Sequence, residues 1–143
     1  MKKQFNVRIY GLLKNNQGDV LLSDEHRFGR SFTKFPGGGL EWGEGIKDCL
    51  VREFKEELNL EIEVGEMFYC TDFFQQSAFN ENDQLISIYY WVKLTNGVFG
   101  KDLPTTLSDA EEQPRWKPLE SISARDLTFP IDKIVAKKLA ALS

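Results

Sequence analysis

The stretch GGLEWGEGIKDCLVREFKEELNL, residues 38–60, contains the pattern that decides the fold. From Gly45 to Leu58 it has no proline and no interior glycine, and an apolar residue recurs at every fourth position. These apolar residues are Ile46, Leu50, Phe54 and Leu58. The repeat predicts a helix of about three to four turns. Asn59 tolerates left-handed backbone geometry and is a suitable residue to end this helix.

The glutamates of this helix do not follow the pattern of a solvated face. With successive residues about 100° apart, Glu57 lies inside the apolar sector, Glu53 lies at its border, and Glu56 lies outside it. Like charges at this spacing repel each other, and partly burying carboxylates costs free energy unless something compensates them. Three hypotheses follow from this geometry alone: a Mg²⁺ or Mn²⁺ site, since hard cations prefer oxygen ligands, an exposed acidic surface, or an ion-pair network with Arg52.

Upstream of this stretch, the chain predicts a hairpin followed by a loop. Residues 5–9 alternate between apolar and polar side chains, which is the period of a half-buried strand. Turn residues at 15–18 then indicate a hairpin with residues 20–22. Residues 25–34 are polar and basic, and the three glycines at 37–39 cannot continue a regular element, so we expect both segments to form a loop.

Downstream, the pattern predicts mostly strands. Residues 60–64 and 68–74 are expected to form two strands, and residues 85–92, apolar or aromatic on both faces, a central strand covered on both sides. Residues 100–114, with two prolines, are expected to form a loop. The last element, residues 130–139, is a predicted helix with proline in its first turn. Strands outnumber helices, so the predicted fold class is α+β.

Length and charge exclude several classes of protein. The 143 residues suit a single domain spanning residues 1–143. Eighteen Lys and Arg against 22 Asp and Glu give a formal net charge of −4, which argues against a protein that wraps polymeric nucleic acid. No run of roughly 20 apolar residues and no apolar leader is present, so we expect a soluble, cytoplasmic protein without membrane association. A homodimer stays open, because exposed aromatic residues cannot be distinguished from core residues in the sequence.

The spacing of residues 38–60 resembles the Nudix box, the 23-residue motif of the Nudix hydrolases. Five residues separate Gly38 from Glu44, and seven separate Glu44 from Arg52, which begins the run that carries the three glutamates. Every constrained position matches except Asn59, where the family usually has glycine. The resemblance implies an α/β/α sandwich with a mixed β-sheet. It also implies Mg²⁺- or Mn²⁺-dependent attack of water on a pyrophosphate linkage in a small nucleotide, a nucleoside diphosphate derivative.

The same resemblance assigns roles to the residues at matching positions. It implies that Glu56 and Glu57 are the principal metal ligands, that Glu53 is a further ligand or the base that deprotonates water, and that Gly38 offers its backbone carbonyl to the metal. Arg52 would orient the neighbouring glutamates, and Glu44 would support that arrangement through hydrogen bonds.

Family members of the MutT branch carry an additional glutamate outside the box, in a loop before a tryptophan-containing segment. The sequence Glu111-Glu112-Gln113-Pro114-Arg115-Trp116 resembles that loop. Glu111 or Glu112 is therefore a candidate for the catalytic base. The alternative for both is a solvated loop glutamate.

Residues that bind the substrate are predicted more broadly. Arg27, Arg30 and Lys34, just upstream of the glycines, are candidates for contacts with phosphate oxygens, and a solvated basic loop is the alternative. Phe74 is a candidate for stacking on a purine, as are Phe73 and Phe129, whereas aromatic residues in strands are more often part of the core. Asp132 is a candidate for reading the edge of the base.

The substrate and the activity itself leave alternatives. No proline lies between Pro36 and Pro104, which disfavours ADP-ribose, and the pairs at 113–114 and 129–130 favour a nucleoside triphosphate of the MutT kind, oxidised purines included. A nucleotide sugar stays open. The rival class is a Nudix-fold nucleotide-binding or regulatory module without activity, and the intact glutamates of the box favour the enzyme.

Overall fold

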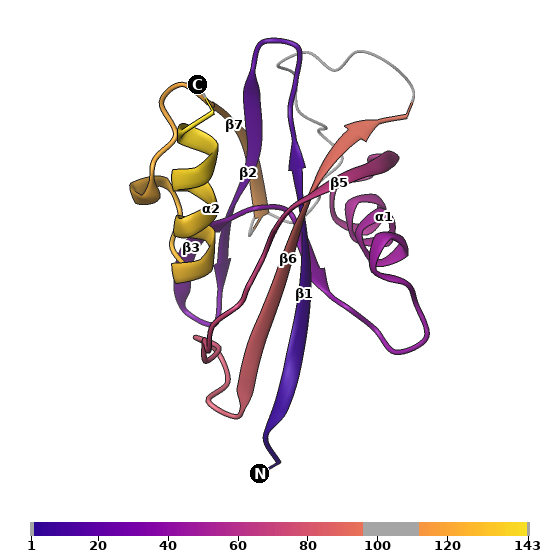
Figure 1. Ribbon diagram of the computed structural model, residues 1–143, viewed down its shortest axis with the longest axis vertical. Coiled ribbons are helices and arrows are strands. Elements are labelled where there is room, and N and C mark those ends of the chain that lie inside the picture. The colour runs from indigo at the N-terminus through magenta and orange to yellow at the C-terminus, as the bar shows by residue number, and fades with distance from the viewer. Residues whose placement is uncertain (1, 96–111, 143) are drawn as a thin grey trace.

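The computed structural model describes residues 2–95 and 112–142 as two β-sheets and two α-helices (Figure 1). The four-stranded sheet has the order β4 (Gly37–Gly39), β1 (Gln4–Leu13), β6 (Asp83–Leu94) and β5 (Ile62–Cys70). The three-stranded sheet has the order β3 (Arg30–Lys34), β2 (Asp19–Arg27) and β7 (Glu112–Pro118). The α-helices are α1 (Ile46–Leu58) and α2 (Pro130–Ala140), and a short 3₁₀ helix, η1 (Ala124–Asp126), precedes α2.

The larger sheet is mixed, as the sequence predicts. Strands β1 and β6 run parallel, whereas β4 pairs antiparallel with β1 and β5 pairs antiparallel with β6. Because parallel neighbours need a long crossover, everything between residues 14 and 82 lies between these two strands in the chain. The predicted α+β fold with a mixed sheet is confirmed.

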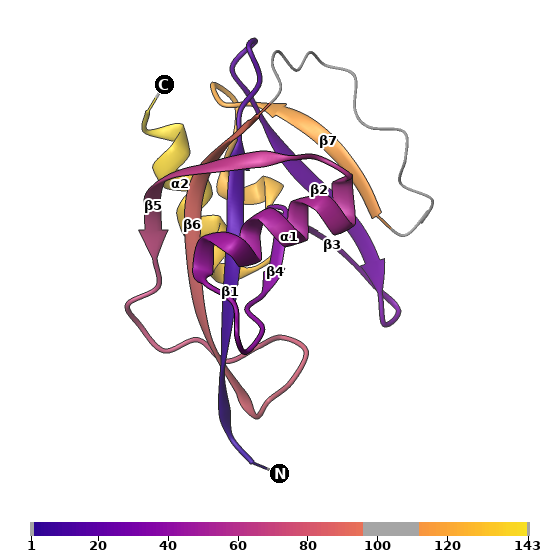
Figure 2. The same cartoon turned by 90° about the vertical axis from the view of Figure 1, so that its right-hand side faces the viewer.

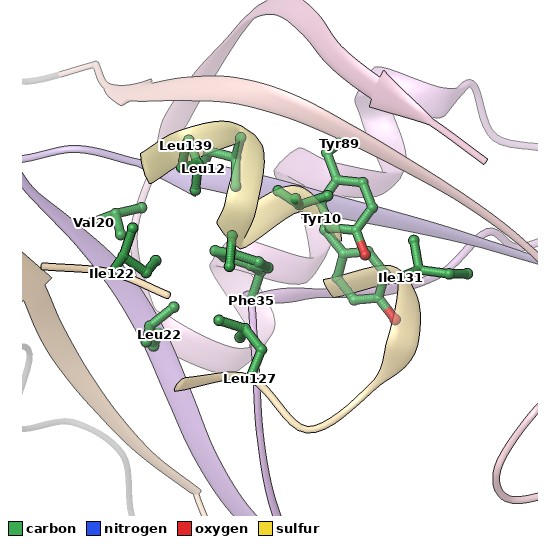
Figure 3. Packing of buried hydrophobic residues seen from close by; sticks show 12 residues of the cluster. Tyr10, Leu12, Val20, Leu22, Phe35, Tyr89, Ile122, Leu127, Ile131 and Leu139 are labelled. Carbon is green, nitrogen blue, oxygen red and sulfur yellow. The ribbon is translucent and has the colours of Figure 1, made fainter. Parts of the chain in front are cut away.

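Two hydrophobic cores hold the layers together, one under each helix. Helix α1 lies across β1 and β4 in Figure 2 and buries Cys49, Leu50, Phe54 and Leu58. These side chains pack with buried residues of the strands: Ile9, Leu13, Leu21, Ile62 and Val92. The second core, shown in Figure 3, packs α2 residues such as Ile131 and Leu139 against Tyr10, Leu22 and Tyr89. Helices therefore cover both sides, as a sandwich requires.

The ends of both helices agree with the sequence analysis. Asn59 ends α1 with φ +54°, its backbone N–H donates to the carbonyl of Lys55, and the N–H of Leu60 donates to that of Phe54. Pro130 occupies the first turn of α2, where the missing N–H costs nothing. The central strand predicted at 85–92 is part of β6 and contacts both cores.

The predicted loop at 25–34 is wrong, and of the predicted hairpin only the turn at 15–18 and one antiparallel bridge next to it form. Strands β1 and β2 belong to different sheets and are connected by an isolated bridge between Lys14 and Val20. Residues 25–34 form the end of β2 and all of β3, which turn at Phe28 and Gly29 with positive φ. This polar segment can form strands because its inward-facing charges are paired inside the protein, as described below.

The glycines at 37–39 also form a strand rather than a loop. Gly37, Gly38 and Gly39 pair with Tyr10, Ile9 and Arg8 of β1. Glycine weakens a strand by itself, so this one depends on its pairing with β1 and on the close approach of neighbours that side chains would block.

A single strand replaces the two expected at 60–64 and 68–74. Strand β5 shifts its register between Val64 and Met67 and again before Tyr69, and it ends at Cys70. Phe73 and Phe74 follow it as exposed residues. Among the described residues, neither helix has the length and the apolar character that crossing a membrane would take.

The packing of α1 makes a first prediction. Phe54 is fully buried against β1, so Phe54→Ala should lower the free energy of unfolding by about 3–5 kcal/mol. Phe5, 68% exposed on the same strand, is the matched control, and Phe5→Ala should change it by less than about 0.5 kcal/mol. Urea unfolding measures both. Equal losses for the two variants would contradict the assigned packing of α1.

Candidate functional site

A cavity of about 670 Å³ lies between the two sheets. Its floor comes from β1 and β6, its sides come from β2, β3, β4 and the segment 75–80, and α1 and the start of α2 each contribute residues. The cavity is lined chiefly by Asn6, Arg8, Tyr10, Glu25, Arg27, Phe28, Phe32, Lys34, Gly38, Glu53, Glu57, Phe79, Asp83, Tyr89, Phe129 and Asp132. It thus combines charged groups with aromatic rings.

Two glutamates of α1 reach the cavity beside β4, and we call this part, Gly38 with Glu53 and Glu57, the acidic end. A Cβ atom added to Gly38 would overlap the carboxylate of Glu53. Glycine at position 38 is therefore required for this approach. Glu57, inside the apolar sector of the helix, and Glu53, at its border, both reach the cavity. Glu56 lies outside that sector, and 56% of its side chain is exposed.

The charge of Glu57 is disfavoured where it stands. Burial is the main cause that raises the pKa of its carboxyl to about 7. Lys34 counteracts this, while the carboxylates of Glu53 and Glu25 raise the pKa further. A crowded set of oxygen donors with too little positive charge is the environment that fits a hard divalent cation.

Acidic side chains alone do not complete such a site. In residues 2–95 and 112–142, no three carboxylates, thiols or imidazoles converge closely enough to hold a metal ion as they stand. A cation at the acidic end would take its remaining ligands from oxygens of the backbone, such as the Gly38 carbonyl, and from water or substrate.

Arg52 joins the glutamates around it. Its Nε and Nη2 atoms donate to the two carboxylate oxygens of Glu44 at 2.9 and 2.8 Å, and its Nη1 donates to Glu56 at 2.9 Å and to Glu53 at 3.3 Å. Nη2 also donates to the Gly39 carbonyl at 3.2 Å. The hydrogen bonds from Arg52 are the main reason that the pKa of Glu44 falls to about 2. The geometry is that of an arginine that orients glutamates.

A second carboxylate pair comes from the three-stranded sheet. Glu25 of β2 and Glu112 of β7 are direct neighbours in the register, and Arg27 forms ion pairs with both. Glu25 lines the cavity, whereas Glu112 does not. Sequence analysis missed Glu25 because it took this segment for a loop. Glu111, the other candidate base, lies outside the described residues.

The three basic residues predicted to bind phosphate occupy different places. Lys34 is buried in the cavity wall, where its Nζ donates to the carbonyls of Phe35 and Gly37 at 3.2 and 3.3 Å and pairs with Glu25 at 3.3 Å. Arg27 lines the cavity as well. Arg30 does not: it donates to the Ala78 carbonyl at 3.1 Å and lies over a phenylalanine ring of the same segment.

Four phenylalanines form the aromatic wall of the cavity. Phe28, Phe32, Phe79 and Phe129 contact each other with ring centroids 5.2–5.9 Å apart. Phe129 was a candidate from the sequence. Phe74, the favoured one, is 70% exposed and does not line the cavity. Phe28 and Phe79 come from a turn and a loop and are exposed, at 84% and 45%, so no periodic pattern of burial marks them in the sequence.

Asp132, the candidate for reading the edge of the base, lies at the start of α2 and lines the cavity. The hydroxyl of Tyr89 donates a hydrogen bond to its carboxylate. Burial is the main cause that raises the pKa of Asp132 to about 6. Asp132 therefore presents a buried acceptor within the same cavity as the aromatic wall.

A family model described as NUDIX domain matches residues 3–138. This chain belongs to the NUDIX domain family. The match covers both sheets, helix α1, most of α2 and every described residue of the cavity, so the predicted membership among the Nudix hydrolases is confirmed. No curated protein sequence matches this NUDIX domain.

Solved structures share its fold at low sequence identity. The MutT protein from Methanosarcina mazei Go1 is 21% identical, over 99% of this chain and 97% of that chain, with a TM-score of 0.74. The E. coli ORF135 protein is 22% identical, over 98% and 91%, with a TM-score of 0.68. An ADP-ribose pyrophosphatase from Streptococcus suis is 19% identical, over 94% and 87%, with a TM-score of 0.62. These likenesses confirm the fold of this NUDIX domain.

The burial of Glu57 predicts a pH dependence of stability. Because folding raises the pKa of Glu57 from 4.5 to about 7, the stability linked to it is complete below pH 4.5 and is lost as the pH rises through 7. In EDTA at pH 8, Glu57→Gln should therefore be more stable than the wild type by roughly 1–3 kcal/mol, and the difference should shrink at pH 5.

Urea unfolding at the two pH values measures this effect. The matched control is Glu63→Gln, because the side chain of Glu63 is 64% exposed. The control should gain nothing at pH 8. A difference between Glu57→Gln and the wild type that is the same at both pH values would contradict the raised pKa of Glu57.

Proposed function

We propose that this NUDIX domain hydrolyses a pyrophosphate linkage in a nucleoside diphosphate derivative with the help of Mg²⁺ or Mn²⁺. One observation carries the proposal: the carboxylate of Glu53 meets the glycine strand at Gly38, and Glu57 lines the same cavity, which also contains the aromatic wall. An acidic group of oxygens by itself would repel a pyrophosphate. Together with a divalent cation it would attract one.

The metal ligands in this proposal are Glu56 and Glu57, with the carbonyl of Gly38, and Glu53 is kept for proton transfer. Arg52 holds Glu53 and Glu56 in place by hydrogen bonds at 3.3 and 2.9 Å. Cations held there would neutralise the pyrophosphate and acidify water for attack on phosphorus.

Glu53 is the better supported of the candidate bases. Its carboxylate faces the cavity beside Gly38, whereas Glu112 is held by Arg27 and does not line the cavity. We therefore assign proton transfer from the attacking water to Glu53, and a supporting place to Glu112 as the partner of Arg27.

For the substrate, we propose a nucleoside triphosphate, with a purine base on the aromatic wall and Asp132 at its edge. Phe32, Phe79 and Phe129 offer flat apolar surface, and the carboxylate of Asp132 can accept a hydrogen bond from a ring N–H. Arg27 and Lys34 line the same cavity and stay candidates for phosphate contacts, although both pair with Glu25. Relatives of this fold include a MutT protein and an ADP-ribose pyrophosphatase, so the choice of substrate rests on the cavity.

A nucleotide-binding module without activity is the second candidate. It would need the cavity and not the carboxylates, so the three glutamates of the box and the Arg52 network favour the enzyme. A cytoplasmic location and a homodimer stay predictions from the sequence.

A panel assay tests the proposed reaction. The purified protein is incubated with Mg²⁺ or Mn²⁺ and with nucleoside triphosphates, oxidised purine nucleotides, ADP-ribose and nucleotide sugars, and the products are identified by chromatography. We expect release of pyrophosphate or phosphate from a nucleoside triphosphate, abolished by EDTA. If no compound is cleaved but one binds, the module without activity is the correct description.

Substitution of the glutamates sharpens the test. Glu56→Gln and Glu57→Gln should each lower kcat by at least about 100-fold, on the order of what removing one element of charge stabilisation costs. Glu63→Gln, an exposed glutamate outside the cavity, should leave kcat unchanged. Unchanged turnover in Glu56→Gln would refute the role assigned to Glu56.

A further inference from the structure

Arg8 is a cation of the cavity that the sequence analysis did not single out. It lies on β1, opposite Gly39 of β4 on one side and Ser87 of β6 on the other. The side chains of Arg8 and Tyr10 line the cavity, while the neighbouring residues Val7 and Ile9 pack toward α1. Arg8 thus projects from the floor of the cavity, directly beside the glycine strand.

The guanidinium of Arg8 is held by a neutral group. Its Nε donates to the hydroxyl of Tyr10 at 3.1 Å. Tyr10 is itself fixed by stacking on Tyr89 at 5.1 Å, and Figure 3 shows the two rings side by side. One edge of the guanidinium is therefore oriented, and its two Nη groups remain.

Those Nη groups form no ion pair with a described residue, although negative charge lies near: Tyr10 is the main cause that raises the pKa of Arg8, and the carboxylates of Glu53 and Glu57 raise it further. Across the part of the chain that the structure describes, no carboxylate lies within ion-pair distance of Arg8, although the side chain is partly buried. Partly burying a charge without an ion-pair partner costs free energy, and an anion bound to the Nη groups would offset that cost.

The other cations around the acidic end differ from Arg8 in this respect. The Nζ of Lys34 contacts two backbone carbonyls and the carboxylate of Glu25, and Arg27 pairs with Glu25 and Glu112. Arg52 is committed to the glutamates of the box. Arg8 is therefore the one of these four that has no carboxylate at ion-pair distance among the described residues.

The absence of a side chain at Gly39 leaves room for the guanidinium of Arg8. A Cβ atom on Gly39 would stand 3.3 Å from Nη1 of Arg8, closer than side chains ordinarily pack. The guanidinium consequently lies next to residue 39, one position from the Gly38 carbonyl that we assign to the metal. An anion on the Nη groups would be adjacent to the acidic end.

We propose that Arg8 binds a phosphate group of the substrate, through its two Nη groups, next to the pyrophosphate linkage that is cleaved. The planar fork of arginine matches two phosphate oxygens at once. The proposal rests on the proposed function for the identity of the anion, but the binding of pyrophosphate to Arg8 can be tested without any turnover.

The first experiment measures binding of inorganic pyrophosphate in the presence of Mg²⁺ by calorimetry. Arg8→Gln should weaken binding at least about tenfold, since hydrogen bonds to charged groups are worth that much. Arg8→Lys keeps the charge without the fork and should show a smaller loss. Arg125→Gln, which removes one exposed charge outside the cavity, is the matched control and should bind like the wild type.

The second experiment uses the wild type, so it does not depend on the variants folding. Phenylglyoxal modifies arginine side chains, and mass spectrometry of peptides reports each site. Pyrophosphate with Mg²⁺ should protect Arg8 from modification and leave the exposed Arg125 unprotected.

The outcomes separate this inference from the proposed function. Protection of Arg8 without cleavage of any nucleotide would overturn the proposed function and support phosphate binding by Arg8. Cleavage of a nucleotide with KM unchanged in Arg8→Gln, or with Arg8 unprotected, would overturn the role of Arg8 and leave the proposed function standing.

Discussion

The close approach of Glu53 to the backbone of Gly38 is the constraint on which the rest of the site depends. Helix α1 packs on one side of the four-stranded sheet, and the cavity opens on the other. The carboxylate of Glu53 can reach the cavity because the strand at that edge has no side chain at position 38. The same strand is held in place by β1, by the donors of Lys34 and by Arg52, so its glycines act as a fixed backbone surface.

The acidic and the basic side chains of the site come from different parts of the chain. Residues 41–66 contain nine acids and three bases, which makes the box and its flanks the acidic part of a chain that is slightly basic elsewhere. The cations that face it come from other elements, β1, β2 and β3. A substrate with phosphates and a divalent cation would meet both signs of charge within one cavity.

The sequence predicts the helical half of the site well and the strand half poorly. The four-residue repeat of α1 places Glu53 and Glu57 correctly, because a long amphipathic helix has a strong period. Glu25 and Arg8 escape such reasoning, since a charged residue in a strand is buried only when a distant partner or a cavity accepts it. Short glycine and polar strands such as β3 and β4 depend on pairing with distant segments, which no local pattern reveals.

The parallel pairing of β1 with β6 has a consequence for how this protein comes to function. The side chains of Gln4 and Asp83, 79 positions apart, are hydrogen-bonded at the rim of the cavity, and Arg8 is aligned with Ser87 in the same pairing. Closing a loop of that length carries an entropic penalty that precedes most of the reward in contacts. Folding should therefore be slow relative to a helical bundle of equal length. A nascent chain cannot complete the cavity until the start of α2 has also left the ribosome, because residues 129–132 line it. Ligand binding therefore becomes possible only after all of these elements have been synthesised.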